Sequence, residues 1–134
     1  MSTRRHRRWF LPETPDVIGL LRRQTAVTIE ALDAFAAWAA GDTAAGEICR
    51  DAEPRGDAAK RDLLNALREA FVLQLEPEDL FTLSRGLDWI LDYARDLIEE
   101  AEAMGVVPDA GIAGMARLLA EAQPHLRDVI VALG

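Results

Sequence analysis

The most constraining feature of this sequence is a run of apolar residues that recur at alternating steps of three and four. These residues occupy one face of a helix, and they are Leu80, Leu83, Leu87, Ile90, Ala94, Leu97, Ala101 and Met104. Pro77 precedes the run, as is common at a first helical position, and Gly105 follows it, as is common after a last one. The spacing therefore predicts a helix that begins near Pro77 and ends at Gly105.

Three further segments show the same helical period. Between Pro15 and Gly41 the apolar positions are Val17, Leu20, Val27, Ala31, Ala34 and Trp38, with Leu21, Thr28 and Phe35 beside them. The next segment carries Ile48, Ala52, Ala59, Leu63, Ala66 or Leu67, and Ala70. The last follows Pro108 and Asp109 and carries Ile112, Met115, Leu119, Ala122, Leu126, Val129 and Leu133. Pro124 inside it is predicted to kink or divide that helix. About four helices joined by short loops predict an all-α fold, an antiparallel up-and-down helical bundle.

The charge is divided unevenly between a short N-terminal arm and the rest of the chain. The net charge of the 134 residues is −8, but the first eight residues include four arginines and no acid. The remainder therefore has 11 basic and 23 acidic residues, a balance of −12. We interpret residues 1–12 as a basic, flexible arm and residues 13–134 as a single domain. An acidic body argues against nucleic-acid binding, which requires cations to neutralise phosphates.

The sequence has no pattern that predicts catalysis. Cys49 is the only cysteine, and the two histidines, His6 and His125, are remote from it in sequence. We interpret Cys49 as a buried apolar residue. A lone cysteine also fits a reducing cytoplasm, and no apolar run reaches the length of a membrane span. The chain is therefore predicted to be a cytoplasmic protein that is not an enzyme.

Two pairs of carboxylates stand out on neighbouring helices. Glu53 and Asp57 are four residues apart, as are Asp88 and Asp92, and each lies one residue past a core position. Counting from the turn between the helices, Asp57 lies level with Asp92, and Glu53 lies level with Asp96. At about 1.5 Å per residue these side chains share one patch. Such oxygen-rich clusters suit hard cations, so Glu53, Asp57, Asp88 and Asp92 are candidate metal ligands.

An alternative reading gives these carboxylates no special role. Acidic residues four apart are frequent on solvated helices, where they form ion pairs with nearby basic residues. Such residues are available here, namely Arg50, Arg55, Lys60 and Arg95. The spacing alone leaves both readings open.

Two stretches resemble a known family. "EPRGD" (53–57) and "LREAFVLQLEPEDLFTLSRGLDWILDYARDLI" (67–98) are similar to the PhoU-like phosphate transport regulator family, in the branch associated with low-affinity phosphate permeases. That family has Glu-x-x-x-Asp in one helix, then an aromatic-led turn, then a helix that reads Leu-Asp-x-hydrophobic-Leu-Asp. Here residues 71–80 match the turn, and Asp88 and Asp92 match the second helix. The weaker likeness runs from about Phe10 to the end of the chain.

The resemblance implies a function. It implies a non-catalytic accessory or regulatory protein of phosphate transport, with a phosphate permease or related membrane transporter as partner. It also implies an Fe, Mn or Mg cluster held by the E/D-x-x-x-D motifs, and a place at the inner face of the membrane. The alternative function is a helical interaction or oligomerisation module that binds no metal.

The sequence departs from the family in two ways. Pro54 and Gly56 lie inside the first motif, where Pro54 is expected to bend the helix and Gly56 to weaken it. Family members also usually have further helices and a second motif pair. The missing half, together with surplus apolar residues such as Phe81, Trp89 and Tyr93, predicts a homodimer or larger homo-oligomer.

Overall fold

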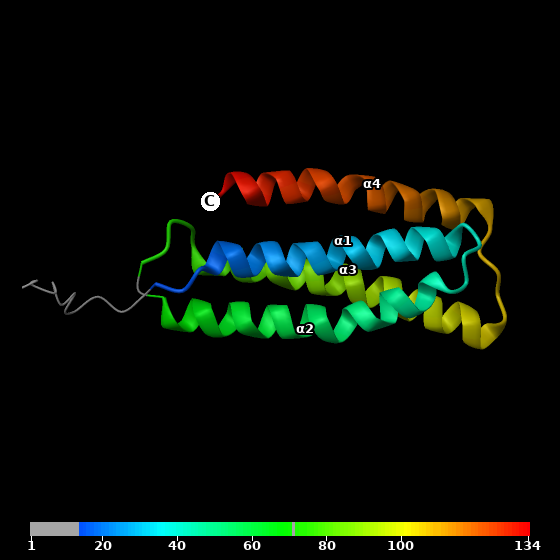
Figure 1. The fold of residues 1–134 in the computed structure, drawn as a ribbon, viewed down its shortest axis with the longest axis horizontal. Helices are drawn as coiled ribbons and strands as arrows, with labels where there is room; N and C mark the ends of the chain where they lie inside the picture. Colours follow the sequence, from blue (N-terminus) through cyan, green and yellow to red (C-terminus); the bar gives the residue numbers. More distant parts are fainter. Residues whose placement is uncertain (1–13, 71) are drawn as a thin grey trace, which may run out of the picture.

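The computed structural model describes residues 14–70 and 72–134, and these contain four helices. The helices are α1 (Val17–Ala39), α2 (Ala45–Glu69), α3 (Pro77–Met104) and α4 (Ala110–Ala132). Successive helices run in opposite directions (Figure 1), so the predicted all-α, up-and-down bundle is confirmed. The basic arm at residues 1–12 and the aromatic residue of the turn, Phe71, lie outside the described residues. None of the described helices is long and apolar enough to cross a membrane.

Local sequence signals explain where the helices begin and end. Oδ1 of Asp16 accepts a hydrogen bond from the Gly19 amide at 2.9 Å, and Oδ1 of Asp109 does the same for Ile112. Such contacts satisfy amides that have no partner within the helix. Gly105 ends α3 with a left-handed φ of 67°, a conformation that glycine adopts readily.

Two prolines lie within helices rather than at their ends. Pro54 is inside α2, and Pro124 is inside α4. Each removes one backbone hydrogen bond, yet both helices continue past the proline. The expectation that Pro124 divides the last helix is therefore wrong, and Glu53 and Asp57 lie within one continuous helix.

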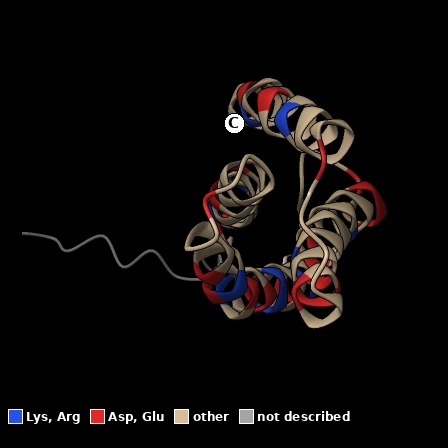
Figure 2. Ribbon diagram, turned by 90° about the vertical axis from the view of Figure 1, so that its right-hand side faces the viewer, with Lys and Arg blue, Asp and Glu red and all other residues tan. Residues whose placement is uncertain are grey.

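The first helix is the centre of the bundle. It packs against α2, α3 and α4, whereas α4, among the described residues, packs closely against α1 alone. The end view shows α4 standing apart from α3 (Figure 2). Arg22 adds a polar link, because its Nη2 donates to the Val131 carbonyl at 3.0 Å. The molecule is therefore a bundle of α1, α2 and α3 with α4 added on one side.

A buried polar layer separates two apolar clusters. One cluster lies around Trp38 and Ile98, and the other lies around Leu21 and Leu63. Between them, the Gln24 side chain donates to the Ser84 carbonyl at 2.8 Å and accepts from the Ser84 hydroxyl at 2.6 Å. These paired bonds tie α1 to α3 and satisfy polar groups that would be costly to bury alone.

Several predicted core positions are exposed. On α4 the buried residues are Ala116, Gln123 and Ile130, seven residues apart. The residues predicted to be in the core but found exposed on α2, α3 and α4 are Ile48, Leu97, Met104, Met115, Leu119, Ala122 and Val129. On α4 these residues are exposed because, among the described helices, α4 packs against α1 alone. One neighbouring helix covers only part of the apolar face of α4.

Candidate functional site

The candidate site is the seam where α2 and α3 face each other. Nζ of Lys60 on α2 lies 2.7 Å from Oδ2 of Asp88 on α3. Further along the same seam, Nη1 of Arg95 on α3 lies 3.1 Å from Oε1 of Glu53 on α2. These contacts fix the antiparallel register, and they place Asp57 level with Asp92. The predicted register of the carboxylates is therefore confirmed.

Three of the four candidate ligands contact basic side chains. Asp57 lies 2.5 Å from Arg61 Nη2 and 3.9 Å from Lys60 Nζ, so Lys60 sits between Asp57 and Asp88. Glu53 is paired with Arg95. We call the seven side chains of this network the carboxylate seam, and they are Glu53, Asp57, Lys60, Arg61, Asp88, Asp92 and Arg95.

Asp92 differs from its neighbours in the carboxylate seam. It forms no ion pair with any residue in 14–70 or 72–134 under a 4.0 Å limit. Burial raises the pKa of its carboxyl group, the charge of Asp88 raises it further, and Arg95 partly offsets the rise. The ionised form of Asp92 therefore lowers the stability of the folded state.

The carboxylate seam, as arranged, does not fit a metal cluster. Within the described ranges, no group of three or more His, Cys, Asp or Glu side chains is placed to hold a metal ion. Lys60 and Arg95 occupy positions between the carboxylates, where they supply the positive charge that a metal would supply. The geometry fits an ion-pair network, and metal binding at Glu53, Asp57, Asp88 and Asp92 stays a prediction.

Gly56 has a packing role that the sequence did not reveal. A Cβ atom at this position would lie 3.0 Å from Cδ1 of Leu91 and 3.7 Å from Cγ1 of Val27. Gly56 is buried where α2 meets α1 and α3. Its missing side chain therefore allows the close approach of helices that forms the carboxylate seam.

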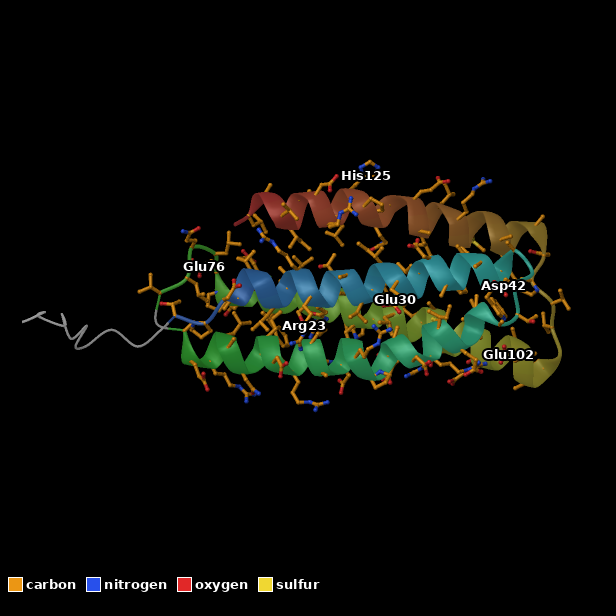
Figure 3. All side chains as sticks on the ribbon, in the orientation of Figure 1. Arg23, Glu30, Asp42, Glu76, Glu102 and His125 are labelled. Atoms are coloured by element: carbon orange, nitrogen blue, oxygen red, sulfur yellow. The ribbon has the colours of Figure 1, made fainter. Side chains whose placement is uncertain are left out.

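The Cys49 thiol is buried and protonated at neutral pH. Cys49 lies in the core, as predicted, and desolvation raises the pKa of its thiol to about 11 despite the nearby charges of Arg50 and Arg95. His125 lies on the exposed side of α4 and points away from the bundle (Figure 3). The arrangement offers no thiolate for nucleophilic chemistry.

A second feature lies on the outer side of α3. The guanidinium carbon of Arg85 lies 4.8 Å from the centre of the Trp89 ring and 5.5 Å from that of Phe81. Tyr93 continues the row one turn further along, and all four side chains are exposed. The importance of Arg85 was missed from the sequence. The sequence signal that could have found it is the spacing of Phe81, Arg85 and Trp89 at four residues, which puts two aromatic rings and a cation on one side of a helix.

Exposed apolar residues also lie on α3 and α4. On α3 they are Tyr93 and Leu97, and on α4 they are Met115, Leu119 and Val129. Helical spacing puts Tyr93 and Leu97 on one side of α3, and puts Met115, Leu119 and Val129 on one side of α4. We call these five residues the α3–α4 surface.

Comparison with protein-family models, with curated proteins and with solved structures gave no match for this chain. The resemblance to the PhoU-like family therefore stays a prediction.

Proposed function

We propose that this chain is a non-catalytic helical interaction module that binds through the α3–α4 surface. The observation that carries the proposal is that α4 packs closely against α1 alone, which leaves Leu97, Met115 and Leu119 exposed. Large contiguous apolar patches are unusual on proteins that act alone, and they mark sites of association.

The charge distribution supports this proposal. The body of the chain is strongly acidic, yet five exposed positions of α3 and α4 carry large apolar side chains. Depletion of charge and enrichment of aromatic residues and methionine are typical of the centre of an interface. Tyr93 and Met115 are residues of this kind, and both are exposed.

The proposal is tested with substitutions that add charge to exposed positions. Leu119→Glu places a carboxylate on the α3–α4 surface, and Val131→Glu places one at another exposed position of α4. We expect the wild-type chain to associate with itself or with a partner from its own host, and Leu119→Glu to lose that association. Val131→Glu should retain it. Sedimentation velocity measures self-association, and quantitative co-purification measures partner binding. The proposal is wrong if the wild type and Leu119→Glu are indistinguishable in both.

A second candidate function is the PhoU-like one, an accessory protein of phosphate transport that binds metal and a phosphate permease. The observation that favours it is the register of α2 and α3, which brings both carboxylate pairs onto one seam. This candidate predicts co-purification with a phosphate permease from host membranes. It also predicts that binding of the phosphate permease is lost when Asp57 and Asp92 are both changed to Ala.

A further inference from the structure

We infer that two copies of this chain pair antiparallel through the outer side of α3, about a two-fold axis at the level of Leu91. This inference goes beyond the proposed function, because it assigns a second copy of the chain to a surface that shares only Tyr93 with the α3–α4 surface. The outer side of α3 is defined by residues at steps of three and four, and they are Thr82, Arg85, Gly86, Trp89, Tyr93, Asp96 and Glu100.

The two large aromatic residues of this side are available for contact. Trp89 is 48% exposed and Tyr93 is 69% exposed. Tryptophan, tyrosine and arginine are the residues most often responsible for binding energy at interfaces. Tyr93 also belongs to the α3–α4 surface, so the outer side of α3 and that surface are continuous.

Arg85 is ordered before any partner arrives. Its guanidinium carbon lies over the Trp89 ring, 4.8 Å from the ring centre, within the range of a cation–π contact. Arg85 forms no ion pair with any residue that the structure describes. An anionic group on a partner is therefore the missing contact.

The outer side of α3 carries that anionic group itself. Its N-terminal half contains the cation Arg85, and its C-terminal half contains the anions Asp96 and Glu100. In antiparallel pairing, residues at equal distances on either side of the axis meet. Arg85 lies six residues before Leu91 and Asp96 lies five residues after it. The two levels differ by one residue, a rise of about 1.5 Å, which the long Arg85 side chain can span to reach the partner's Asp96.

The same axis matches the other positions. Trp89 and Tyr93 lie two residues before and after Leu91, and Thr82 and Glu100 lie nine before and after. The Trp89 ring of one copy therefore lies over the partner's Tyr93, and the Thr82 hydroxyl can donate to the partner's Glu100. One register thus pairs aromatic with aromatic, cation with anion, and hydroxyl with carboxylate, each of them twice.

Gly86 fits this arrangement. A Cβ atom at Gly86 would have no heavy atom within 4 Å, so packing inside the described chain does not require glycine here. Gly86 and Asp96 lie five residues before and after Leu91. A glycine at this point of the outer side lets a second helix approach closely beside the Arg85–Asp96 contact.

The charge balance restricts how two copies can meet. Two bodies that each carry a charge near −12 repel one another, so they can meet only where opposite charges are matched. The two-fold arrangement provides this match with two Arg85–Asp96 contacts. Both partners supply the same residues, as a closed two-fold interface requires.

Charge reversal tests the pairing. Arg85→Glu places a second carboxylate opposite Asp96 at both contacts, and Asp96→Arg places two cations opposite each other. Each variant alone should weaken self-association by about tenfold or more, because like charges face each other twice. An equimolar mixture of the two variants should associate as the wild type does, because each of the two contacts in a mixed pair joins opposite charges. The double variant Arg85→Glu/Asp96→Arg should restore self-association fully, because each contact again joins opposite charges.

Matched controls lie on α4. Asp128 is exposed and contacts the adjacent Arg127, just as Asp96 contacts the adjacent Arg95. Asp128→Arg and Arg117→Glu should leave self-association unchanged. Circular dichroism confirms that each variant is folded, and Trp89→Gln gives a second disruption that changes no charge.

The measurement is sedimentation velocity of the full chain at concentrations up to about 100 µM, since interfaces of ordinary size bind in the micromolar range or tighter. A wild-type dimer, disrupted by each single reversal and restored in the double variant, supports the pairing. A wild type that stays at 14.7 kDa, or a double variant that stays monomeric, overturns it. If the wild type is monomeric but binds a different partner, and Leu119→Glu loses that partner, then only the pairing is wrong and the proposed function stands.

Discussion

Lys60 on α2 and Asp88 on α3 form the ion pair that closes the middle of the carboxylate seam, with 2.7 Å between Nζ and Oδ2. Only 25% of the Lys60 side chain and 15% of the Asp88 side chain are exposed. Solvent therefore screens this pair less than the others around it. Its loss would leave a half-buried carboxylate without a counter-charge.

The first prediction compares Lys60 with its neighbour. Lys60→Met should lower the free energy of unfolding by about 1 to 2 kcal/mol, because Asp88 loses its partner while partly buried. Arg61→Met breaks a pair in which the Arg61 side chain is 66% exposed, and should change stability by less than about 0.5 kcal/mol. Urea denaturation measures both. Equal effects would show that the Lys60 pair is no more buried than the Arg61 pair.

The second prediction concerns the charge of Asp92. Because the pKa of Asp92 is raised in the folded state, the folded protein binds the proton more tightly than the unfolded chain does. Stability due to this group therefore falls as the pH rises from the ordinary aspartate pKa through the raised one. Asp92→Asn should be more stable than the wild type at neutral pH, by up to about 0.5 kcal/mol. The difference should vanish in acid.

Glu30 provides a control of opposite sign. Hydrogen bonds from Arg55 lower the pKa of Glu30, so its stabilising effect is present at neutral pH and is lost as the pH falls through the lowered value. Glu30→Gln should be less stable than the wild type at neutral pH. If Asp92→Asn lowers the thermal midpoint at pH 7, as Glu30→Gln should, the proposed electrostatics of Asp92 are wrong.

The third prediction separates two glycines within helices. Gly56→Ala should destabilise the protein despite the better helix propensity of alanine, because the new Cβ would press on Leu91 at 3.0 Å. Gly114→Ala, where nothing lies within 4 Å, should stabilise the protein by up to about 1 kcal/mol. Thermal unfolding of both variants measures the contrast. A stabilising Gly56→Ala would refute the close approach of α2 and α3.

The fourth prediction compares adjacent residues of α4. Ile130 is fully buried, whereas Val129 is 59% exposed. Ile130→Ala should cost about 2 to 4 kcal/mol, and Val129→Ala should cost less than about 0.5 kcal/mol. The measurement is chemical denaturation at a protein concentration where the chain is monomeric. A larger cost at Val129 would mean that α4 is rotated toward the apolar stripe of the sequence.

The elements of the fold could be predicted because their signals are local. Gly105 needs only its own backbone conformation to end α3, and Asp109 needs only the next turn to cap α4. The register of α2 and α3 followed from the short turn between them, which left Asp57 level with Asp92. Such features depend on neighbours in the sequence, so the sequence is sufficient to find them.

Other features depend on contacts between distant segments. Ser84 can be buried because Gln24 of α1 forms hydrogen bonds with its carbonyl and hydroxyl groups. The sequence around Ser84 contains no pattern that predicts these bonds. Met115 is exposed because α4 meets one helix rather than two. The positions of Lys60 and Arg95 in the sequence are equally compatible with side chains that point to solvent. Only the packing of α2 against α3 directs these side chains into the carboxylate seam.

The most direct test of the account is the thermal midpoint of the wild-type protein with and without about 1 mM Mn²⁺, Mg²⁺ or iron. A metal present at about one hundred times its dissociation constant adds about 2.7 kcal/mol to the stability of the state that binds it. If Lys60 and Arg95 neutralise the carboxylate seam, so that no metal is needed there, the midpoint should not move. A rise of several degrees that Asp92→Ala abolishes would contradict this account and favour the metal-binding regulator.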